Sequence, residues 1–239
     1  DYPPAPDGDW SGSRGITRPG SSRQLYAVSE DGLEWVKPEL DLYEEDGRKT
    51  NIVLGGREYP GSAHALALTI DPHPPSAEER YRALFNHIQE RLTPGRGHQV
   101  RSAHSADGIH WTVYDQVPSF GLGGSRLGDV SVLSYDEDAR EFVHNTRHYA
   151  QTIGSGANPR TPRSSTFIRS HELNNFAADN RRRIFQCRSH DMVHWSEPIV
   201  VAAPDDIGDD LDESFYCMSQ FRLGTVHLAT VGVLRSVEN

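Results

Sequence analysis

The chain has 239 residues, enough for one large domain with a substantial core. Its formal net charge of −10 excludes the broadly basic surface that nucleic acids or anionic membranes require, so we expect neither as a partner. The hydrophobic fraction of 36%, together with 21 Gly and 15 Pro, favours short strands joined by polar turns over a helical fold. The sequence therefore predicts an all-β fold in a single domain spanning residues 1–239.

Residues 1–23 are rich in Pro, Gly, Ser and Arg and predict an irregular N-terminal segment. Strand-like runs follow, at 24–28, 51–54, 63–70, 81–87, 128–133, 141–147, 184–188, 213–218 and 224–231. A short helical turn with a Ser cap is expected at 76–80, and a long loop at 149–175. Because the chain starts in a loop-like segment and ends just after a strand, we expect both ends to be truncated.

A Ser-x-Asp-Gly-x-x-Trp motif recurs along the chain, as Ser29–Trp35, Ser105–Trp111 and Ser189–Trp195. Ser and Asp side chains cap turn amides, Gly takes a positive-φ position and Trp opens the next strand, so each copy predicts an outer β-hairpin. The third copy has Met192 in place of Gly, which predicts a different turn type there. We expect the three Trp side chains to pack at the seams between repeat units rather than to bind a ligand.

The spacing of the copies favours four-stranded antiparallel units with large loops, arranged as a β-propeller. Successive motifs lie 76 and 84 residues apart, whereas plain propeller repeats need about 40 to 50 residues. The first strand of each blade lines the channel of a propeller. Asn51, Asp129 and Glu213 follow the preceding Trp by 16, 18 and 18 residues, so we expect them to open equivalent strands and to converge at one mouth of the channel.

Several local sequences add to this pattern: the three turn motifs, Lys37-Pro38-Glu39-Leu40, Asn51-Ile52-Val53-Leu54, Asp71-Pro72 followed by Glu79-Arg80-Tyr81, and the Asp-then-Glu order of the strand openings. Together they resemble the five-bladed propellers of glycoside hydrolase families 32, 43 and 68, from about residue 24 to residue 234. The resemblance implies a five-bladed β-propeller of four-stranded antiparallel blades. It also implies hydrolysis of a fructan, an arabinan or a related furanoside or pyranoside.

In those families, one Asp is the nucleophile or base, a second Asp holds the substrate and a Glu is the general acid. Such enzymes act through paired carboxylates. The resemblance therefore implies catalytic roles for Asp129, as the second Asp, and Glu213, as the general acid. Asn51 stands where the first carboxylate is expected. Either the reacting carboxylate lies elsewhere, at Asp71 or Asp212, or the protein is a carbohydrate-binding or scaffolding propeller that does not cleave its ligand.

Six further side chains are candidates for contact with the substrate: Asn51, His64, Arg147, His148, Asp212 and Arg222. Arg222 could equally pair with an acid. The 12 His residues show no His-x-x-x-His spacing and the chain has no Cys-x-x-Cys, so neither a zinc site nor a cofactor is expected.

The Cys residues, Cys187 and Cys217, could form one disulfide, although two buried free thiols are the preferred interpretation. No fourth turn motif follows the strand that opens at Glu213. The ring is therefore expected to be incomplete in this chain, and a partner chain or a missing segment would complete it.

Overall fold

The computed structural model describes residues 23–45, 47–55, 62–88, 98–120, 130–149, 182–204, 208–210 and 213–235, without the side chains at 62–65, 87–88, 98–99 and 148–149. The predictions for 1–22 and 150–175, and those for Asp129 and Asp212, lie outside the described residues.

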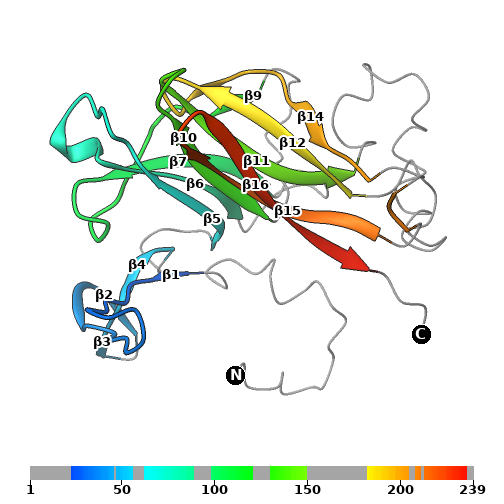
Figure 1. The fold of residues 1–239 in the computed structure, drawn as a ribbon. Coiled ribbons are helices and arrows are strands. Elements are labelled where there is room, and N and C mark those ends of the chain that lie inside the picture. The colour runs from blue at the N-terminus through cyan, green and yellow to red at the C-terminus, as the bar shows by residue number, and fades with distance from the viewer. Residues whose placement is uncertain are drawn as a thin grey trace.

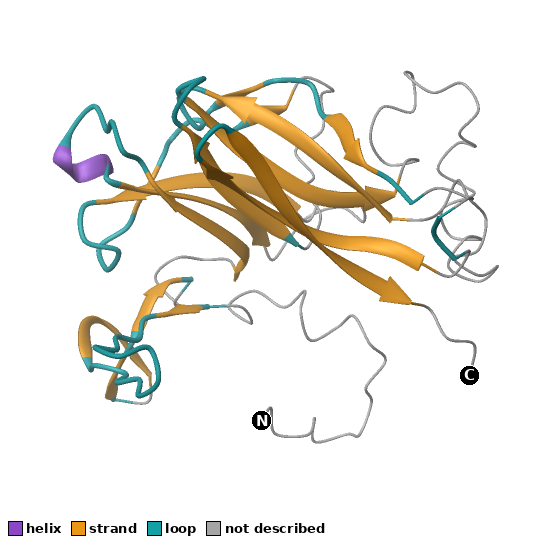
Figure 2. Cartoon of the chain, in the orientation of Figure 1, coloured by secondary structure: helices purple, strands orange, loops and turns teal. Residues whose placement is uncertain are grey.

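The described chain is built of strands, with one 3-10 turn, which confirms the all-β prediction for this part of the protein (Figures 1 and 2). The elements are β1 (Gln24–Leu25), β2 (Leu40–Glu45), β3 (Arg48–Thr50), β4 (Ile52–Leu54), β5 (Ser62–Ile70), η1 (Ala77–Glu79), β6 (Tyr81–Ile88), β7 (His98–Ser105), β8 (Thr112–Val113), β9 (Ser119–Phe120), β10 (Ser131–Asp136), β11 (Glu141–Tyr149), β12 (Arg182–Ser189), β13 (His194–Trp195), β14 (Ile199–Ala202), β15 (Glu213–Leu223) and β16 (Val226–Arg235). The helical turn was expected, but Ser76 makes no side-chain cap bond to it. No helix in the described part is long and apolar enough to cross a membrane.

Two four-stranded antiparallel sheets form the centre of the molecule, with strand orders β5-β6-β7-β8 and β10-β11-β12-β14. Strands β15 and β16 form a long antiparallel hairpin. Smaller pairs are β1-β4, β2-β3 and the parallel pair β9-β13. The first strand of the second sheet, β10, contacts both β5 and β15, so the first strands of three successive units lie side by side.

The main core lies between the two four-stranded sheets. Leu84 and Val100 from the first sheet pack in one cluster with Leu133 and Phe142 from the second, and all four are buried. The two sheets therefore share one apolar layer. The neighbouring residues Phe85 and Ala103 point to the opposite face of the first sheet and belong to a second buried cluster, so β6 is buried on both faces.

The turn motifs share one geometry. In each copy the Ser hydroxyl donates to the Asp carboxylate at 3.0–3.1 Å. The amide three residues after Ser donates to the Ser oxygen at 2.8–3.0 Å, and the next two amides donate to the Asp carboxylate at 2.7–2.9 Å. The fourth residue of the motif has φ of +78° at Gly32, +78° at Gly108 and +68° at Met192. The prediction of a different turn at Met192 is therefore wrong: the same hydrogen bonds hold a fully buried Met in a conformation that favours Gly.

The position of the motifs in the sheets confirms the hairpin prediction for two copies. The second copy joins β7 to the edge strand β8, and the third follows β12 and precedes the edge strand β14. The first copy instead lies within the single bridge Val28↔Val36, outside any four-stranded sheet.

The Trp side chains of the three copies differ in burial, and the first copy is again the exception. Trp195 is buried and stacks on Phe120 with ring centroids 5.6 Å apart, and Trp111 packs against the cluster that contains Phe85. Trp35 is 61% exposed. The predicted packing role holds for two of the three Trp residues and is wrong for Trp35 within the described chain.

The two cysteines are free, as expected. Cys187 lies in the main core, and burial raises the pKa of its thiol to about 12. Cys217 is only partly buried, on β15.

Three side-chain amides join β15 to the second sheet. Gln186 Nε2 donates to Asn145 Oδ1 at 3.1 Å and to Gln220 Oε1 at 3.0 Å, and Asn145 Nδ2 donates to Gln220 Oε1 at 3.2 Å. Asn145 and Gln186 are buried. We call these three residues the amide ladder. It links β11, β12 and β15 by hydrogen bonds between neutral groups.

Candidate functional site

The strands β5, β10 and β15 run in the same direction, so their starts define one end of the molecule. Arg147, next to the start of β10, lies over the ring of Tyr216, near the start of β15. At the other end His73, just after β5, contacts Tyr135 near the end of β10, with ring centroids 6.3 Å apart. We call the end at which β5, β10 and β15 begin the start end, and the opposite end the far end.

The predicted site residues are divided between the two ends. The start end holds the described residues His64 on β5, Arg147 and His148 on β11, and Glu213 on β15. The far end holds Asp71 and Arg222.

This division separates two of the proposed acids. The six residues of β10 alone span about 20 Å at roughly 3.3 Å per residue. Paired carboxylates in glycosidases lie only about 5 to 9.5 Å apart. Asp71 and Glu213 therefore do not share one site.

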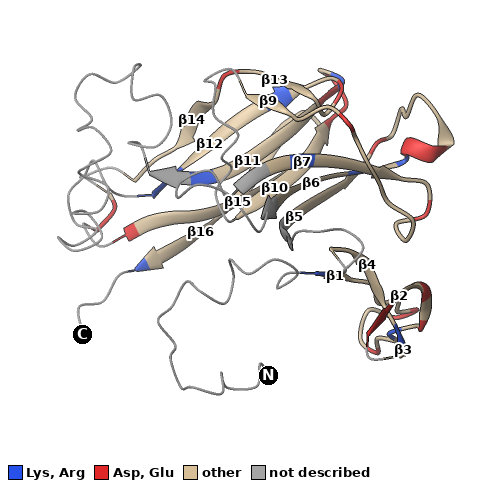
Figure 3. Cartoon of the chain, turned by 180° about the vertical axis from the view of Figure 1, so that it is seen from behind, with Lys and Arg blue, Asp and Glu red and all other residues tan. Residues whose placement is uncertain are grey.

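Glu213 is held at the start of β15 by an ion pair. Its Oε1 accepts hydrogen bonds from Arg235 Nε at 2.9 Å and from the Arg235 terminal nitrogen at 2.6 Å. Its Oε2 accepts from the amide of Asp210 at 3.1 Å. Glu213 and Arg235 face each other because they are register partners in the hairpin, and Figure 3 shows the acidic and basic strand ends side by side. A role as general acid would require this pair to open.

Tyr216 is presented by a β-bulge. Phe215 pairs with Val233 and Cys217 pairs with Gly232, so Tyr216 is the extra residue on β15. Bulges re-aim side chains and are common near active sites.

Two guanidinium groups lie over the re-aimed ring. Arg147 is 4.2 Å and Arg182 5.2 Å from the Tyr216 ring centroid. The start-end cluster consists of Arg147, Arg182, Glu213, Tyr216 and Arg235. It combines an aromatic ring, hydrogen-bond donors and one carboxylate.

Asp71 belongs to a buried network at the far end. Its Oδ2 accepts from Arg82 Nε at 3.2 Å and from the Arg82 terminal nitrogen at 3.1 Å, and its Oδ1 accepts from the amide of His73 at 2.9 Å. Arg82 also donates to Glu79 and Tyr114, and the Tyr114 hydroxyl donates to Glu79 at 2.6 Å. Asp71 thus caps a turn and neutralises a buried guanidinium.

The pKa values in this network follow from burial and pairing. Burial by itself raises the pKa of Glu79, but the hydrogen bond from Tyr114 and the charge of Arg82 outweigh it and lower the pKa. Burial, followed by the bond to Glu79, raises the pKa of Tyr114. The network borders a cavity of about 430 Å³ between the two four-stranded sheets.

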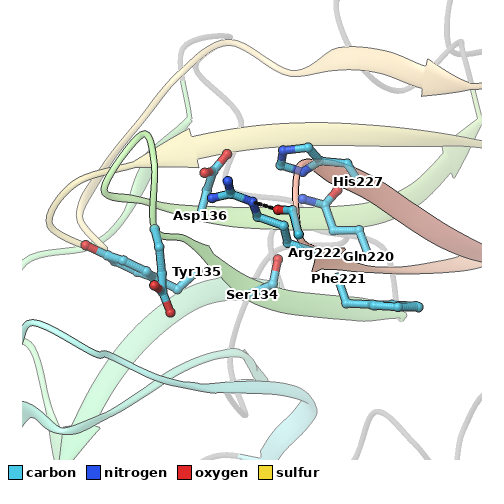
Figure 4. Close-up of a pocket in the computed structure, with 9 residues that line it drawn as sticks. Ser134, Tyr135, Asp136, Gln220, Phe221, Arg222 and His227 are labelled. Carbon is cyan, nitrogen blue, oxygen red and sulfur yellow. Dashed lines mark hydrogen bonds between the residues drawn. The ribbon is translucent and has the colours of Figure 1, made fainter.

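Arg222 lines a second far-end cavity, of about 540 Å³, between the β10-β11 and β15-β16 hairpins (Figure 4). Its guanidinium pairs with Asp138, and its Nε donates to the carbonyl of Gly224 at 2.6 Å. Of the two expected roles for Arg222, the structure shows the pairing with an acid.

Asn51 precedes β4, in the small β1-β4 sheet, and its side-chain amide donates to the carbonyl of Tyr26 at 2.6 Å. It does not open one of the strands that lie beside β10, which are β5 and β15, so the expected equivalence with Glu213 is wrong. The strand that corresponds to β10 in the first sheet is β5, which starts at Ser62. The spacing from Trp35 was misleading because three short strands, β2, β3 and β4, precede β5, whereas two precede β10 and one precedes β15.

Sequence reasoning missed Tyr216, Arg182 and Arg235 at the start end. Counting outward from the Gly224-Thr225 turn would place residue 236 opposite Glu213, and only the bulge at Tyr216 brings Arg235 to that position. Tyr216 depends on a bulge, which leaves no periodic signal. In the described part of the chain no group of three or more His, Cys, Asp or Glu is arranged to hold a metal ion.

Comparison with known proteins gives only distant structural matches. No protein-family model and no curated protein matches the sequence. Among solved structures, a proposed glycoside hydrolase of Parabacteroides distasonis matches with TM-score 0.38 and 14% identity, over 72% of this chain and 42% of that one. The GH32 β-fructofuranosidase BmSUC1 of Bombyx mori matches with TM-score 0.40 and 12% identity, over 77% and 31%.

An N-acetylgalactosamine deacetylase of F. plautii matches with TM-score 0.32 and 9% identity, over 83% of this chain and 66% of that one. The chain therefore spans less than half the length of the first two proteins. It is distantly similar in structure to glycoside hydrolases.

Proposed function

We propose that the protein is a glycoside hydrolase that acts on a fructan, an arabinan or a related furanoside or pyranoside at the start end of a propeller. The supporting observation is that β5, β10 and β15 lie side by side and run in the same direction. First strands in this arrangement line the channel of a propeller and bring sequence-distant residues together at its mouth. Five four-stranded blades remain part of the proposal.

In the proposed reaction Glu213 protonates the leaving oxygen and Asp129, which directly precedes Val130 in the sequence, holds the substrate. Tyr216 offers a ring surface near Glu213, and Arg147, with His64 and His148, contacts hydroxyl groups. Asp212, next to Glu213 in the sequence, is the candidate for the further carboxylate that a hydrolase needs.

A second candidate function is carbohydrate binding or scaffolding without cleavage. The ion pair between Glu213 and Arg235 favours this second function, because Glu213 could act as a general acid only if the pair opened.

The deciding experiment is a hydrolysis screen with aryl glycosides, fructans and arabinans, combined with calorimetric binding of the same polymers. For the hydrolase, Glu213→Gln should abolish turnover of substrates with poor leaving groups while binding persists, because Gln keeps the shape but cannot give up a proton. Asp129→Asn should weaken both turnover and binding of the substrate.

The matched control is Asp138→Asn, at an exposed position of the far end, which should behave as the unmodified protein. Binding with no hydrolysis supports the second function. Unchanged turnover in Glu213→Gln removes this residue from the mechanism.

A further inference from the structure

The second far-end cavity, between the β10-β11 and β15-β16 hairpins, contains hydrogen-bonding groups that have no partner among the described residues. The Ser134 hydroxyl and the His227 ring line this cavity and form no hydrogen bond to any residue that the structure describes. Arg222 uses its Nε and one terminal nitrogen in the bonds given above, so its other terminal nitrogen keeps its N–H donors. Figure 4 shows Arg222 between Asp136 and Gln220, with His227 beside them.

The amide ladder fixes the orientation of Gln220, whose side chain also lines this cavity. Arg188 can only donate, and its Nε donates to Gln186 Oε1 at 3.3 Å, so the Gln186 amide nitrogen must face the ladder. That nitrogen donates to Gln220 Oε1 at 3.0 Å, and Asn145 donates to the same oxygen at 3.2 Å. The Gln220 oxygen is therefore engaged in the ladder. Its amide nitrogen, which donates to no described residue, is left for the cavity.

The charged groups of the cavity wall are neutralised by neighbours. Arg222 pairs with Asp138, and Asp136 accepts a hydrogen bond from Arg188 at 3.1 Å. Glu137 also lines the cavity, but it is exposed, so solvent screens its charge. A charged ligand would lose hydration here without meeting a buried, unpaired opposite charge, and this loss costs free energy. The cavity therefore favours a neutral ligand.

The available groups include both donors and acceptors. Gln220 and Arg222 offer N–H donors, the Asp136 carboxylate accepts, and Ser134 and His227 can do either. A hydroxyl group also donates and accepts, and a sugar carries several hydroxyl groups on one ring. The cavity volume of about 540 Å³ lies within the range of roughly 300 to 1,000 Å³ that ligand pockets have.

We propose that this cavity binds one unit of a neutral sugar: Gln220 and Arg222 donate to its hydroxyl groups, and Asp136 accepts from them. The site is separate from the proposed catalytic site, because β10 alone sets the two ends of the molecule about 20 Å apart. Binding here breaks no bond in the sugar, so the inference goes beyond the proposed function and does not rest on hydrolysis.

The other far-end cavity, beside the Asp71 network, has no comparable donors on its arginine. Every guanidinium nitrogen of Arg82 donates to a described residue, which is Asp71, Glu79 or Tyr114. The Tyr114 hydroxyl in turn donates to Glu79. The guanidinium of Arg82 thus serves the fold, whereas that of Arg222 has donors left for a ligand.

Titration of the isotope-labelled full chain with D-galactose, D-glucose, D-fructose and L-arabinose, followed by NMR, tests the inference. None of these monosaccharides contains a glycosidic bond, so hydrolysis cannot interfere. At least one of them should shift the backbone amides of residues 134–137 and 220–227 in a saturable way. No saturable shift in these segments with any of the four sugars overturns the inference, and so do shifts confined to the start end.

Charged analogues test the neutral class of the ligand. D-galacturonate and D-galactosamine should bind at least about tenfold more weakly than the tightest neutral sugar, because the cavity offers neither of them a buried counter-charge. Tighter binding of either analogue than of every neutral sugar overturns this part of the inference.

Variants of the hairpin locate the site. Arg222→Met should raise the dissociation constant of the bound sugar at least about tenfold, and His227→Ala by about three- to tenfold. Both positions are on the surface, so the variants should keep the far-UV circular dichroism spectrum of the unmodified protein. The matched control is Leu223→Ala, which is 66% exposed on the same hairpin, does not line the cavity and should leave the dissociation constant unchanged. Unchanged affinity in Arg222→Met overturns the inference.

The hydrolysis screen separates this result from the proposed function. Sugar-dependent shifts at the far end without any hydrolysis support the second site and remove the hydrolase. Hydrolysis without such shifts does the reverse.

Discussion

Gly232 lies opposite Cys217 in the β15-β16 hairpin, and a methyl group on Gly232 would come within 2.7 Å of the Cys217 sulfur. The close approach occurs one step beyond the bulge that presents Tyr216. Gly232→Ala should therefore destabilise the protein by about 1 to 2 kcal/mol, as overpacking of a tight contact does. Urea unfolding measures this change.

The rescue for this clash is Cys217→Ala. In that background Gly232→Ala should be neutral or slightly stabilising, because Ala is preferred to Gly inside a strand. A double-mutant cycle with no coupling between the two positions would contradict the clash.

Met192 should show an unusual order of stability among its variants. Met192→Ala removes a fully buried side chain and should cost about 2 to 5 kcal/mol. Met192→Gly removes the same contacts but relieves the positive φ of +68°, which costs a residue with a side chain about 1 to 2 kcal/mol. The Gly variant should therefore be the more stable of the two, the reverse of the usual order, in denaturant titrations.

Gly108→Ala is the matched control at the same position of the second copy. A Cβ there meets no atom within 4 Å, so the backbone effect alone should destabilise it. Equal stability of this variant and the unmodified protein would argue against strain at both positions.

Asp191 should contribute to stability above about pH 4 and lose that contribution as the pH falls to 2. Burial by itself raises the pKa of Asp191, but bonds from His194 and from the turn amides lower it from 3.8 to about 2. A depressed folded-state pKa means that the unfolded chain binds the proton first, so acid favours unfolding in this window.

In Asp191→Asn the free energy of unfolding should depend less on pH between pH 4 and pH 2. The side chain is 51% exposed, so solvent screening limits the effect to about 1 kcal/mol. Chemical unfolding at several pH values measures it, with Asp138→Asn as the exposed control. If Asp191→Asn lost as much stability between pH 4 and pH 2 as the unmodified protein, the hydrogen bonds to Asp191 would not be the cause of the acid sensitivity.

The Asp71-Arg82 pair should be far more sensitive to loss of one partner than to loss of both. Each side chain is 5% exposed. Arg82→Met leaves an unpaired buried carboxylate and should destabilise by about 3 to 5 kcal/mol, whereas Asp71→Leu with Arg82→Met should recover most of the loss. Thermal unfolding of the single and double variants tests this, and a double variant as unstable as the single would contradict it.

The repeat motif made much of the fold predictable. Three Ser-x-Asp copies fixed the turn geometry because the side chains that cap the amides are part of the motif itself. The spacing of the same motif predicted four-stranded antiparallel units, and two of them are present in the described chain. Trp35 was misjudged because burial depends on a neighbouring sheet, which the local sequence does not encode.

The site was less predictable than the fold. Glu213 was correctly expected at the start of a strand, but its pairing with Arg235 depends on hairpin register rather than on sequence proximity. Asp71 was chosen as an acid next to a Pro, and no local pattern distinguishes a catalytic carboxylate from one that neutralises a buried arginine. Asn51 was misplaced because the count from Trp35 assumed equal numbers of strands in each unit.

The amide ladder of Asn145, Gln186 and Gln220 makes the junction between β15 and the second sheet insensitive to acid. None of the three amides titrates, so protonation of Asp191 weakens a turn while these bonds persist. A slip of β15 by one residue would turn Gln220 to the opposite face and leave buried amides unsatisfied, at about 1 to 3 kcal/mol for each. The amide ladder therefore holds β15 in its register. On acidification the amide protons of the outer turns should exchange with solvent before those of this junction do.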